Sequence, residues 1–337
     1  MKKPLLLILF FSITIVSLTF AQVRPQYSQY MLNNYLLNPA ITGIEDYMDV
    51  KMSFRNQWAG IEGAPTTYYV TAHTQLGWNT NIANPSKVGD KLHAFAPKDS
   101  HYNRYKKIKP HHAIGGAIFY DKIGIFSTSE ATVSYAYHLL LTPQVKLSAG
   151  VSAGISQYAM RGSDLRLANP TDNLATNVVI SKPIVSAGLW LYSSHFYGGI
   201  SITQLAGNSF DFNANAIDQG QSVRHFFATM AYKFTLAEKL TAVPSVLAKV
   251  ANPLPLTMDY NLRLLYADRI WGGLSYRPSA KGYIFMAGIH LNNTFDMSYS
   301  YDMGQNQIGR MSNGSHEITL GIRLNNKFGV YCPTNLW

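Results

Sequence analysis

Hydrophobic and polar residues alternate with a period of two through most of the chain after residue 45. In the clearest segment, residues 145–156, the odd positions are apolar or small and the even positions are Lys, Ser or Gly. Successive side chains of a strand point to opposite faces, so this pattern predicts strands with one apolar and one polar face. No apolar stripe with helical spacing over three or four turns follows residue 45.

The alternating segments predict about fourteen strands. Several of them run ten residues or more, whereas strands of globular proteins usually have about five or six residues. A tilted strand needs about 9–11 residues to cross a membrane. Strand length therefore favours a transmembrane barrel over a sandwich. The expected strands are 49–58, 66–76, 111–121, 128–140, 144–158, 182–193, 195–204, 222–236, 239–250, 257–267, 269–277, 282–291, 294–302 and 315–325.

Composition narrows the class of protein further. Only 14% of the 337 residues are charged, against about 25% in an average soluble domain, and the chain has 22 Tyr and 16 Phe. Few charges with many aromatics argue against disorder. Bacterial outer-membrane barrels have an even number of antiparallel strands, an apolar outside and a polar inside. We therefore predict an all-β fold, a single antiparallel transmembrane β-barrel of about 14 strands.

The first 21 residues have the layout of a secretory signal peptide. Lys2 and Lys3 precede an apolar run from Leu5 to Phe20, and Ala21 offers a small residue at a cleavage position. Export is consistent with an outer-membrane location. The expected organisation is a signal peptide at 1–21, an N-terminal periplasmic or plug segment at 22–48, the barrel at 49–325 and a C-terminal tail at 326–337.

Connection lengths predict the topology. Links at 141–143, 193–194, 237–238, 268 and 292–293 are short, whereas those at 159–181, 205–221 and 303–314 are long. Because such barrels have short periplasmic turns and longer outer loops, both termini are expected in the periplasm. Residues 77–110 are a long link on the short-turn side. They form a solvated loop or a periplasmic docking loop for an acidic partner, with these basic residues: Lys87, Lys91, Lys98, Arg104, Lys106, Lys107 and Lys109.

Motifs for catalysis are weak. Residues 150–154 match the G-x-S-x-G pattern of hydrolases, but that motif requires a strand-to-helix elbow, and Ser152 lies in the middle of an alternating strand. The histidines follow no usual metal-ligand spacing. We expect no catalytic residue, cofactor or metal site, and no nucleic-acid partner.

The segment before the first strand carries the most specific motifs. Residues 26–43 are too polar and broken to span a membrane, and their aromatics require burial in the barrel interior or at its periplasmic mouth. The motifs are Gln26-Tyr27-Ser28-Gln29-Tyr30, Asn38-Pro39-Ala40-Ile41-Thr42-Gly43, Arg55-Asn56-Gln57-Trp58-Ala59-Gly60 and Pro65-Thr66-Thr67, with further motifs at 243–249, 271–277, 299–302 and 314–318.

Together these motifs resemble the PorP/SprF family of type IX secretion system outer-membrane proteins of the Bacteroidetes. The resemblance implies a non-enzymatic barrel of the secretion and gliding machinery. It implies, as partners, surface proteins with a type B C-terminal sorting domain and periplasmic components of the secretion apparatus. Residues 78–110 are longer and more basic than is usual for the family, so their role is the least transferable.

Within this resemblance, one set of residues is predicted to form the plug or to contact a partner, with a purely structural role as the alternative. Arg55 and Gln57 are expected on the inward face, where they could hold the plug. A channel or small-solute transporter remains the competing function, because a barrel of about fourteen strands is wide enough to be either filled or open. The candidate residues are Tyr27, Ser28, Gln29, Tyr30, Asn38, Pro39, Gly43, Arg55, Gln57 and Trp58.

Overall fold

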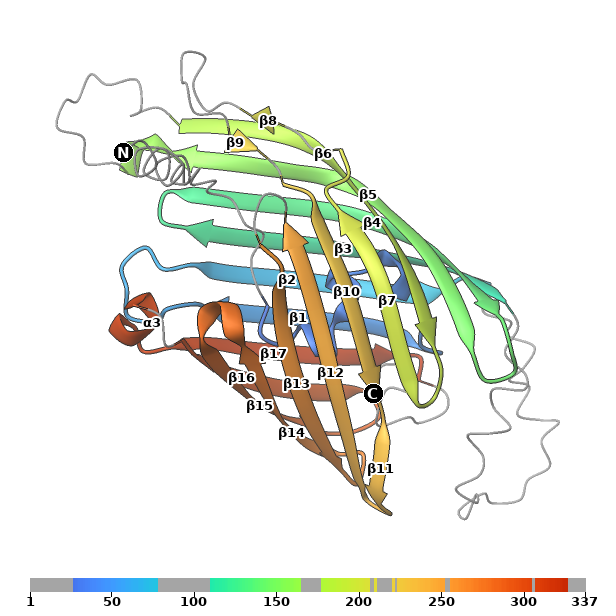
Figure 1. The fold of residues 1–337 in the computed structure, drawn as a ribbon. Helices are drawn as coiled ribbons and strands as arrows, with labels where there is room; N and C mark the ends of the chain where they lie inside the picture. Colours follow the sequence, from blue (N-terminus) through green and yellow to red (C-terminus); the bar gives the residue numbers. More distant parts are fainter. Residues whose placement is uncertain are drawn as a thin grey trace, which may run out of the picture.

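The protein is a closed antiparallel β-barrel, which confirms the predicted fold class (Figure 1). The computed structural model describes residues 27–77, 110–164, 177–206, 209–210, 220–221, 223–251, 255–304 and 307–326. Within these ranges fourteen strand positions make up the barrel wall. The strands of the wall are β1 (Met48–Asn56), β2 (Thr66–Gln75), β3 (His111–Ile123), β4 (Phe126–Leu140), β5 (Lys146–Arg161), β6 (Asn177–Tyr192), β7 (Phe196–Thr203), β10 (His225–Tyr232), β11 (Phe234–Ala237), β12 (Leu240–Ala251), β13 (Thr257–Tyr266), β14 (Ile270–Arg277), β15 (Gly282–His290), β16 (Phe295–Met303) and β17 (Ser315–Leu324).

Two of these elements share one position in the wall. β10 pairs with β7 on one side and with β12 on the other, and β11 continues along β12 after a break at Lys233. The sequence predicts one strand over 222–236. In the structure β10 and β11 lie end to end beside β12 and together take the place of that strand. A separate two-residue pair joins β8 (Ser209–Phe210) to β9 (Gly220–Gln221).

The first and last strands close the barrel. β1 pairs with β17 from Met48↔Leu324 to Asn56↔His316, and β10 pairs with both β7 and β12. Every described strand of the wall except the short β11 therefore has a partner on both sides, as a hydrocarbon environment requires. Apolar side chains such as Val133 and Ile155 point outward and are more than 60% exposed. Among the described residues, no helix has the length and apolar character needed to cross a membrane.

Most charged strand residues lie on the inner face, and the outward Lys122 and Arg161 lie near the loop-end tips of β3 and β5. Arg263, Glu317 and Arg323 are buried on the inner face, and several charges are paired: an Arg277 nitrogen lies 2.8 Å from an Asp259 oxygen, and Arg323 lies 2.7 Å from Asp296. Ser152 of the G-x-S-x-G pattern is paired with Ser134 and Ser186 in the middle of the sheet. It is therefore not on a strand-to-helix elbow.

The two ends of the barrel differ in their connections. At one end, here called the turn end, the links are 141–145, 193–195, 238–239, 267–269 and 291–294. At the other, the loop end, the links include 57–65, 162–176, 204–224 and 304–314, and the last contains the short helix α3 (Gln307–Met311). The length rule for these barrels predicts that the turn end is periplasmic. Three loop-end links, 124–125, 252–256 and 278–281, are short, so the predicted alternation of short and long links is not strict.

Residues 77–110 leave the barrel at the turn end. Gln75 ends β2 there and His111 begins β3, which is the side that the sequence predicts. The seven basic residues of this segment lie outside the described residues, as do residues 1–26 and 327–337.

Four neighbouring strands are longer than the sequence predicts. β3, β4, β5 and β6 have 13, 15, 16 and 16 residues, whereas the adjoining β2 and β7 have 10 and 8. The predicted strands end early at the loop end: 121 instead of Ile123, 158 instead of Arg161, and a start at 182 instead of Asn177. In Figure 1 these green strands extend past the others.

Candidate functional site

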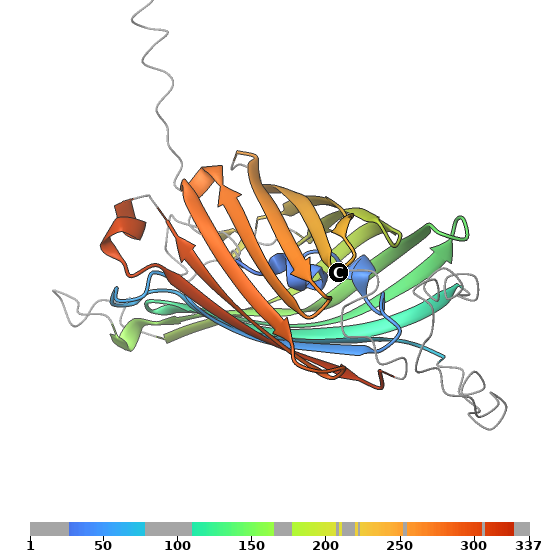
Figure 2. The same cartoon turned by 90° about the horizontal axis from the view of Figure 1, so that it is seen from below.

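Residues 27–47, here called the plug, occupy the lumen of the barrel. They form three short 3-10 helices, η1 (Tyr30–Leu32), η2 (Asn34–Leu36) and η3 (Pro39–Ile41). Every plug residue except Leu32 and Asp46 is buried. Figure 2 shows the helices enclosed between opposite sides of the wall.

The plug runs through the lumen from the loop end to the turn end. Ser28 lies beside Arg55 and Glu317 near the loop end, whereas Tyr47 joins β1 at the turn end. The plug therefore crosses the lumen once before the first strand, and its first described residues lie at the opposite end of the barrel from Leu324. The two chain ends themselves lie outside the described residues.

Charged residues of the wall bind the loop-end part of the plug. The backbone N–H of Ser28 donates to a Glu317 carboxylate oxygen at 2.8 Å, and the Gln29 amide donates to the Glu317 carbonyl at 2.8 Å. The Arg55 guanidinium donates to the Ser28 hydroxyl and also lies 3.2 Å from Glu317 and 3.3 Å from Asp302. Hydrogen bonds that involve a charged group are roughly twice as strong as neutral ones, so this cluster anchors the plug firmly.

Aromatic residues fill the middle of the lumen. The Tyr27 ring packs edge-on against Tyr69, with ring centroids 5.4 Å apart. The Tyr30 hydroxyl accepts a hydrogen bond from Asn261 at 2.5 Å, and the Tyr35 hydroxyl lies 2.7 Å from the Ser134 hydroxyl. Burial raises the pKa of Tyr35 to about 12 and holds the pKa of Tyr30 well above its ordinary value. Both phenols are therefore neutral hydrogen-bonding groups at neutral pH.

The Asn38-Pro39-Ala40 turn fastens the plug to two strands at once. The Asn38 amide nitrogen donates to the carbonyls of Leu189 on β6 and Ile200 on β7, at 3.0 and 3.1 Å. Its side-chain oxygen accepts from the Ala40 N–H at 2.9 Å. Asn38 thus caps η3 and crosslinks two neighbouring strands.

The wall is built to receive this turn closely. Gly150 and Gly188 face it, and a Cβ on Gly150 would lie 2.5 Å from the Ala40 backbone, while one on Gly188 would lie 2.0 Å from the Asn38 side chain. The Ser148 hydroxyl donates to the Ala40 carbonyl at 2.6 Å. Sequence reasoning missed these wall residues, although glycine within a strand is a signal of close backbone approach.

At the turn end the plug makes a sharp bend at Gly43. Its backbone φ is +64°, and a Cβ there would lie 2.3 Å from the Ala113 Cβ. The Gly43 N–H donates to His73 Nδ1 at 3.1 Å, and His138 Nε2 lies 2.7 Å from the Thr42 carbonyl. Only glycine fits both the left-handed backbone and the contact.

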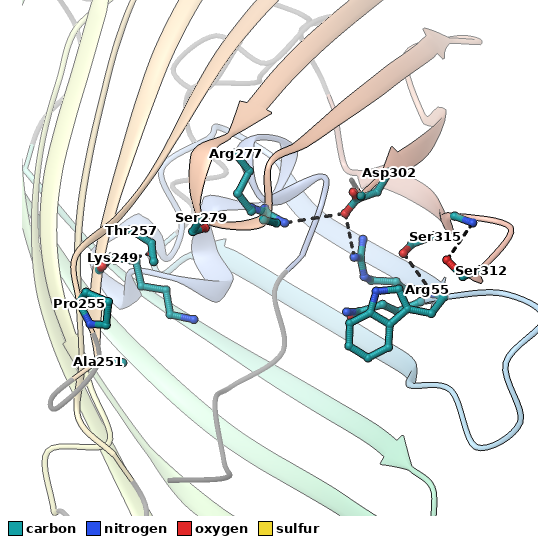
Figure 3. A pocket seen from close by; sticks show the side chains of 15 residues that line it. Arg55, Lys249, Ala251, Pro255, Thr257, Arg277, Ser279, Asp302, Ser312 and Ser315 are labelled. Atoms are coloured by element: carbon teal, nitrogen blue, oxygen red, sulfur yellow. Dashed lines mark hydrogen bonds and ion pairs between the residues drawn. The ribbon is translucent and has the colours of Figure 1, made fainter. Parts of the chain in front are cut away.

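A cavity of about 310 Å³, here called the vestibule, opens at the loop end beside the start of the plug (Figure 3). Arg55 and Arg277 line it, and carboxylates balance their charges: Arg55 pairs with Glu317, Arg277 pairs with Asp259, and Asp302 lies between the two arginines, 3.3 Å from Arg55 and 3.8 Å from Arg277. Lys249 also lines the cavity. A cavity lined by forked guanidinium groups, hydroxyls and an aromatic suits recognition of a polypeptide segment better than storage of an apolar solute.

Trp58 lines the vestibule with a strained backbone. Its φ is +54°, a region that bulky residues rarely adopt. The Trp58 N–H donates to the Ser315 hydroxyl at 3.2 Å. Strained backbone of this kind is concentrated at functional sites, which marks Trp58 as a candidate contact for a partner.

The structure divides the ten predicted residues into two groups. Seven belong to the plug, and of the other three only Arg55 bonds to it. Gln57 and Trp58 line the vestibule instead. Within the described residues no group of three His, Cys, Asp or Glu side chains is placed to hold a metal ion.

The family model for "Type IX secretion system membrane protein PorP/SprF" matches residues 19–322. The chain belongs to the PorP/SprF family. It is therefore a membrane protein of the type IX secretion system class, and its barrel places it in the outer membrane. No curated protein matches it significantly.

Solved outer-membrane barrels are similar to the PorP/SprF chain in fold alone. The Ralstonia pickettii toluene transporter TbuX is 8% identical over 88% of this chain and 93% of its own, with a TM-score of 0.48. A Pseudomonas aeruginosa FadL homologue is 8% identical over 91% and 96%, also with a TM-score of 0.48. Acinetobacter baumannii Omp33 is 8% identical over 84% and 100%, with a TM-score of 0.45.

Proposed function

We propose that this protein is a non-enzymatic outer-membrane anchor of the type IX secretion and gliding machinery. It binds surface proteins that carry a type B C-terminal sorting domain, holds them or helps their export, and connects to periplasmic components of the apparatus. Membership of the family supports the role in secretion. The two classes of partner are what we propose beyond it.

The observation that carries the proposal is the occupied lumen. Buried helices η1 to η3 fill the barrel and are bonded to the wall at both ends and in the middle. A barrel closed in this way presents fixed surfaces to macromolecules at each end. At the loop end that surface is the vestibule, with its two arginines and Trp58.

The test is capture of the client from the outer membrane. The full chain with an affinity tag, purified in mild detergent from its native host, is expected to co-purify with a large surface protein bearing a type B C-terminal domain. Deleting that domain from the client should abolish capture, and transferring it to an unrelated exported protein should confer capture. Equal recovery of the client with and without its C-terminal domain would contradict the proposal.

The basic segment 78–109 supports the periplasmic connection. It carries seven basic residues against two acidic ones and is attached to β2 and β3 at the turn end. We propose that it binds an acidic periplasmic partner. Deleting 80–108 should leave the barrel folded and release that partner, and a partner that still co-purifies with the deleted protein contradicts this part.

A channel or small-solute transporter is the competing function. It requires that solute passes the plug, so it predicts a steady conductance for the intact protein. The anchor proposal predicts that the intact barrel does not conduct.

A further inference from the structure

The outer surface of the barrel has a groove of about 850 Å³ that crosses β4, β5, β6, β7, β10 and β12. In Figure 1 the yellow β7 and β10 run at a steep angle to the green β4 and β5, so the groove spans a bend of the wall. One row of cross-strand partners runs along it from β4 to β12. The row consists of Tyr137, Ala149, Leu189, Ile200, Ala228 and Ala248.

Short side chains hollow the wall at this place. Ala149, Ala187 and Ala228 line the groove and extend only one methyl group from the backbone. Tyr135 and Phe226 also line it, but they are large, point outward and are 42% and 47% exposed. The groove therefore follows from the residues that the outward faces of these strands carry.

The plug holds the floor of the groove from the lumen side. Gly150 and Gly188 line the groove and also face the plug, which a Cβ on either of them would meet. Asn38 donates to the carbonyls of Leu189 and Ile200, which are cross-strand partners of β6 and β7. These bonds fix the two strands relative to each other, and a site that is already formed loses little freedom when it binds a ligand.

The lining and the position of the groove identify its occupant as hydrocarbon. Apart from the hydroxyls of two tyrosines, the outward side chains of the lining are aliphatic or aromatic. The groove lies on the face that the barrel turns to the membrane, so the molecules that reach it are lipids. An acyl chain in the groove makes apolar contact along its length.

Polar groups lie at the β4 end of the groove. The Tyr135 hydroxyl lies 2.5 Å from His112 Nδ1, and the Tyr137 and His112 rings lie 4.7 Å apart. His112 is exposed on the outer face near the start of β3, at the turn end. When His112 Nδ1 accepts from the tyrosine hydroxyl, Nε2 carries the proton and can donate to a phosphate oxygen. Amphipathic rings of this kind lie at the level of the lipid headgroups.

We propose that the groove binds one phospholipid of the leaflet at the turn end, with an acyl chain across Ala149 and Ala228 and the phosphate beside His112. The turn end is the predicted periplasmic end, so the lipid comes from the inner leaflet of the outer membrane. The lipid contacts the outer side of the same strands that Asn38 holds from inside. This site is separate from the vestibule and from the basic segment.

Tryptophan substitutions of outward alanines test the acyl-chain contact. Ala149→Trp and Ala228→Trp place an indole in the groove, whereas the control Ala131→Trp places it on the outward face of β4 outside the lining. The probe is dioleoyl phosphatidylethanolamine, added to the delipidated full-length protein in detergent, with bound lipid counted by native mass spectrometry. Excluding about two methylene groups weakens binding about tenfold. Wild type and control should bind one lipid, and both groove variants should bind it about tenfold more weakly.

A second comparison tests the phosphate contact. Wild type should prefer the phospholipid to dioleoylglycerol, which has the same chains without the phosphate. His112→Ala should reduce that preference about tenfold, because a hydrogen bond to a charged group is lost. The control is His316→Ala, since His316 makes the same kind of bond to Tyr299, at 2.6 Å, near the loop end.

Three results overturn the inference. Equal binding of the phospholipid by wild type, both groove variants and the Ala131→Trp control would show that the groove holds no lipid. If lipid binding is unchanged but the wild type is a dimer that Ala228→Trp converts to monomers, a second copy of the chain covers the groove. An unchanged preference for the phospholipid in His112→Ala would remove the phosphate contact and with it the assignment to one leaflet. Unheated electrophoresis shows for each variant that the barrel is folded.

Discussion

Arg55 and Glu317 are cross-strand partners at the seam where β1 meets β17, and their side chains lie 3.2 Å apart. Both also bind Ser28 at the start of the plug. The same ion pair therefore stabilises both the β1–β17 seam and the binding of the plug in the lumen. Loss of the pair should weaken both.

Removing one member of this pair should be worse than removing both. Glu317→Ala leaves the buried Arg55 with one fewer carboxylate, and breaking a buried ion pair costs about 3 kcal/mol or more. The double variant Arg55→Met with Glu317→Met fills the space with apolar groups and should be less destabilised. Urea unfolding in lipid bilayers measures both, and a double variant less stable than Glu317→Ala would contradict the role of the pair.

The close fit at Gly188 predicts a clash on adding one methyl group. Gly188→Ala would place a Cβ 2.0 Å from the Asn38 side chain, so the turn must leave its site, and we expect a destabilisation of about 1–3 kcal/mol. Gly272→Ala is the control, because its nearest neighbour is the Met286 carbonyl oxygen at 3.9 Å. Equal unfolding free energies for the two variants would show that the plug does not pack here.

The hydrogen bonds of Asn38 to Leu189 and Ile200 predict how often the plug leaves its place in the lumen. In a Cys332→Ser background, Ala40→Cys places a thiol at a position that is 0% exposed, and labelling by a maleimide should be slow. Adding Asn38→Ala leaves the Leu189 and Ile200 carbonyls without this donor, which costs about 1–3 kcal/mol. Labelling should then be about tenfold faster, and an unchanged rate would assign Asn38 no part in holding the plug.

Trp58 should show opposite effects on stability and binding. Trp58→Gly relieves the left-handed backbone, so the unfolding free energy should be unchanged or raised by up to about 1 kcal/mol. The same change removes an aromatic from the vestibule, so client capture should fall. A stable variant with full capture would exclude Trp58 from the partner surface, and a destabilised one would mean that the indole is needed for folding.

Strand positions were predictable because hydrocarbon outside and polar groups inside impose a strict alternation. The prediction was poorest at the loop end of β4, β5 and β6, where polar residues such as Ser129, Gln157 and Ser181 take outward positions and the alternation is lost. The predicted strands therefore stop short of Phe126, Met160 and Val178.

The plug was predictable in outline and not in contacts. A polar, aromatic segment before the first strand requires burial, and that follows from composition. Its partners do not, because Asn38 bonds to Leu189 and Ile200, which are more than 150 residues away in sequence. The direction of the plug through the lumen depends on these long-range bonds, and the sequence alone does not show them.

Conductance of the purified full-length protein in planar bilayers tests the central claim, that the lumen is closed by the chain's own plug. The intact barrel should show no large steady current, and a variant lacking residues 27–43 should conduct as an open pore, which proves that the preparation can report one. A large, steady conductance from the intact protein would contradict the account and favour a channel.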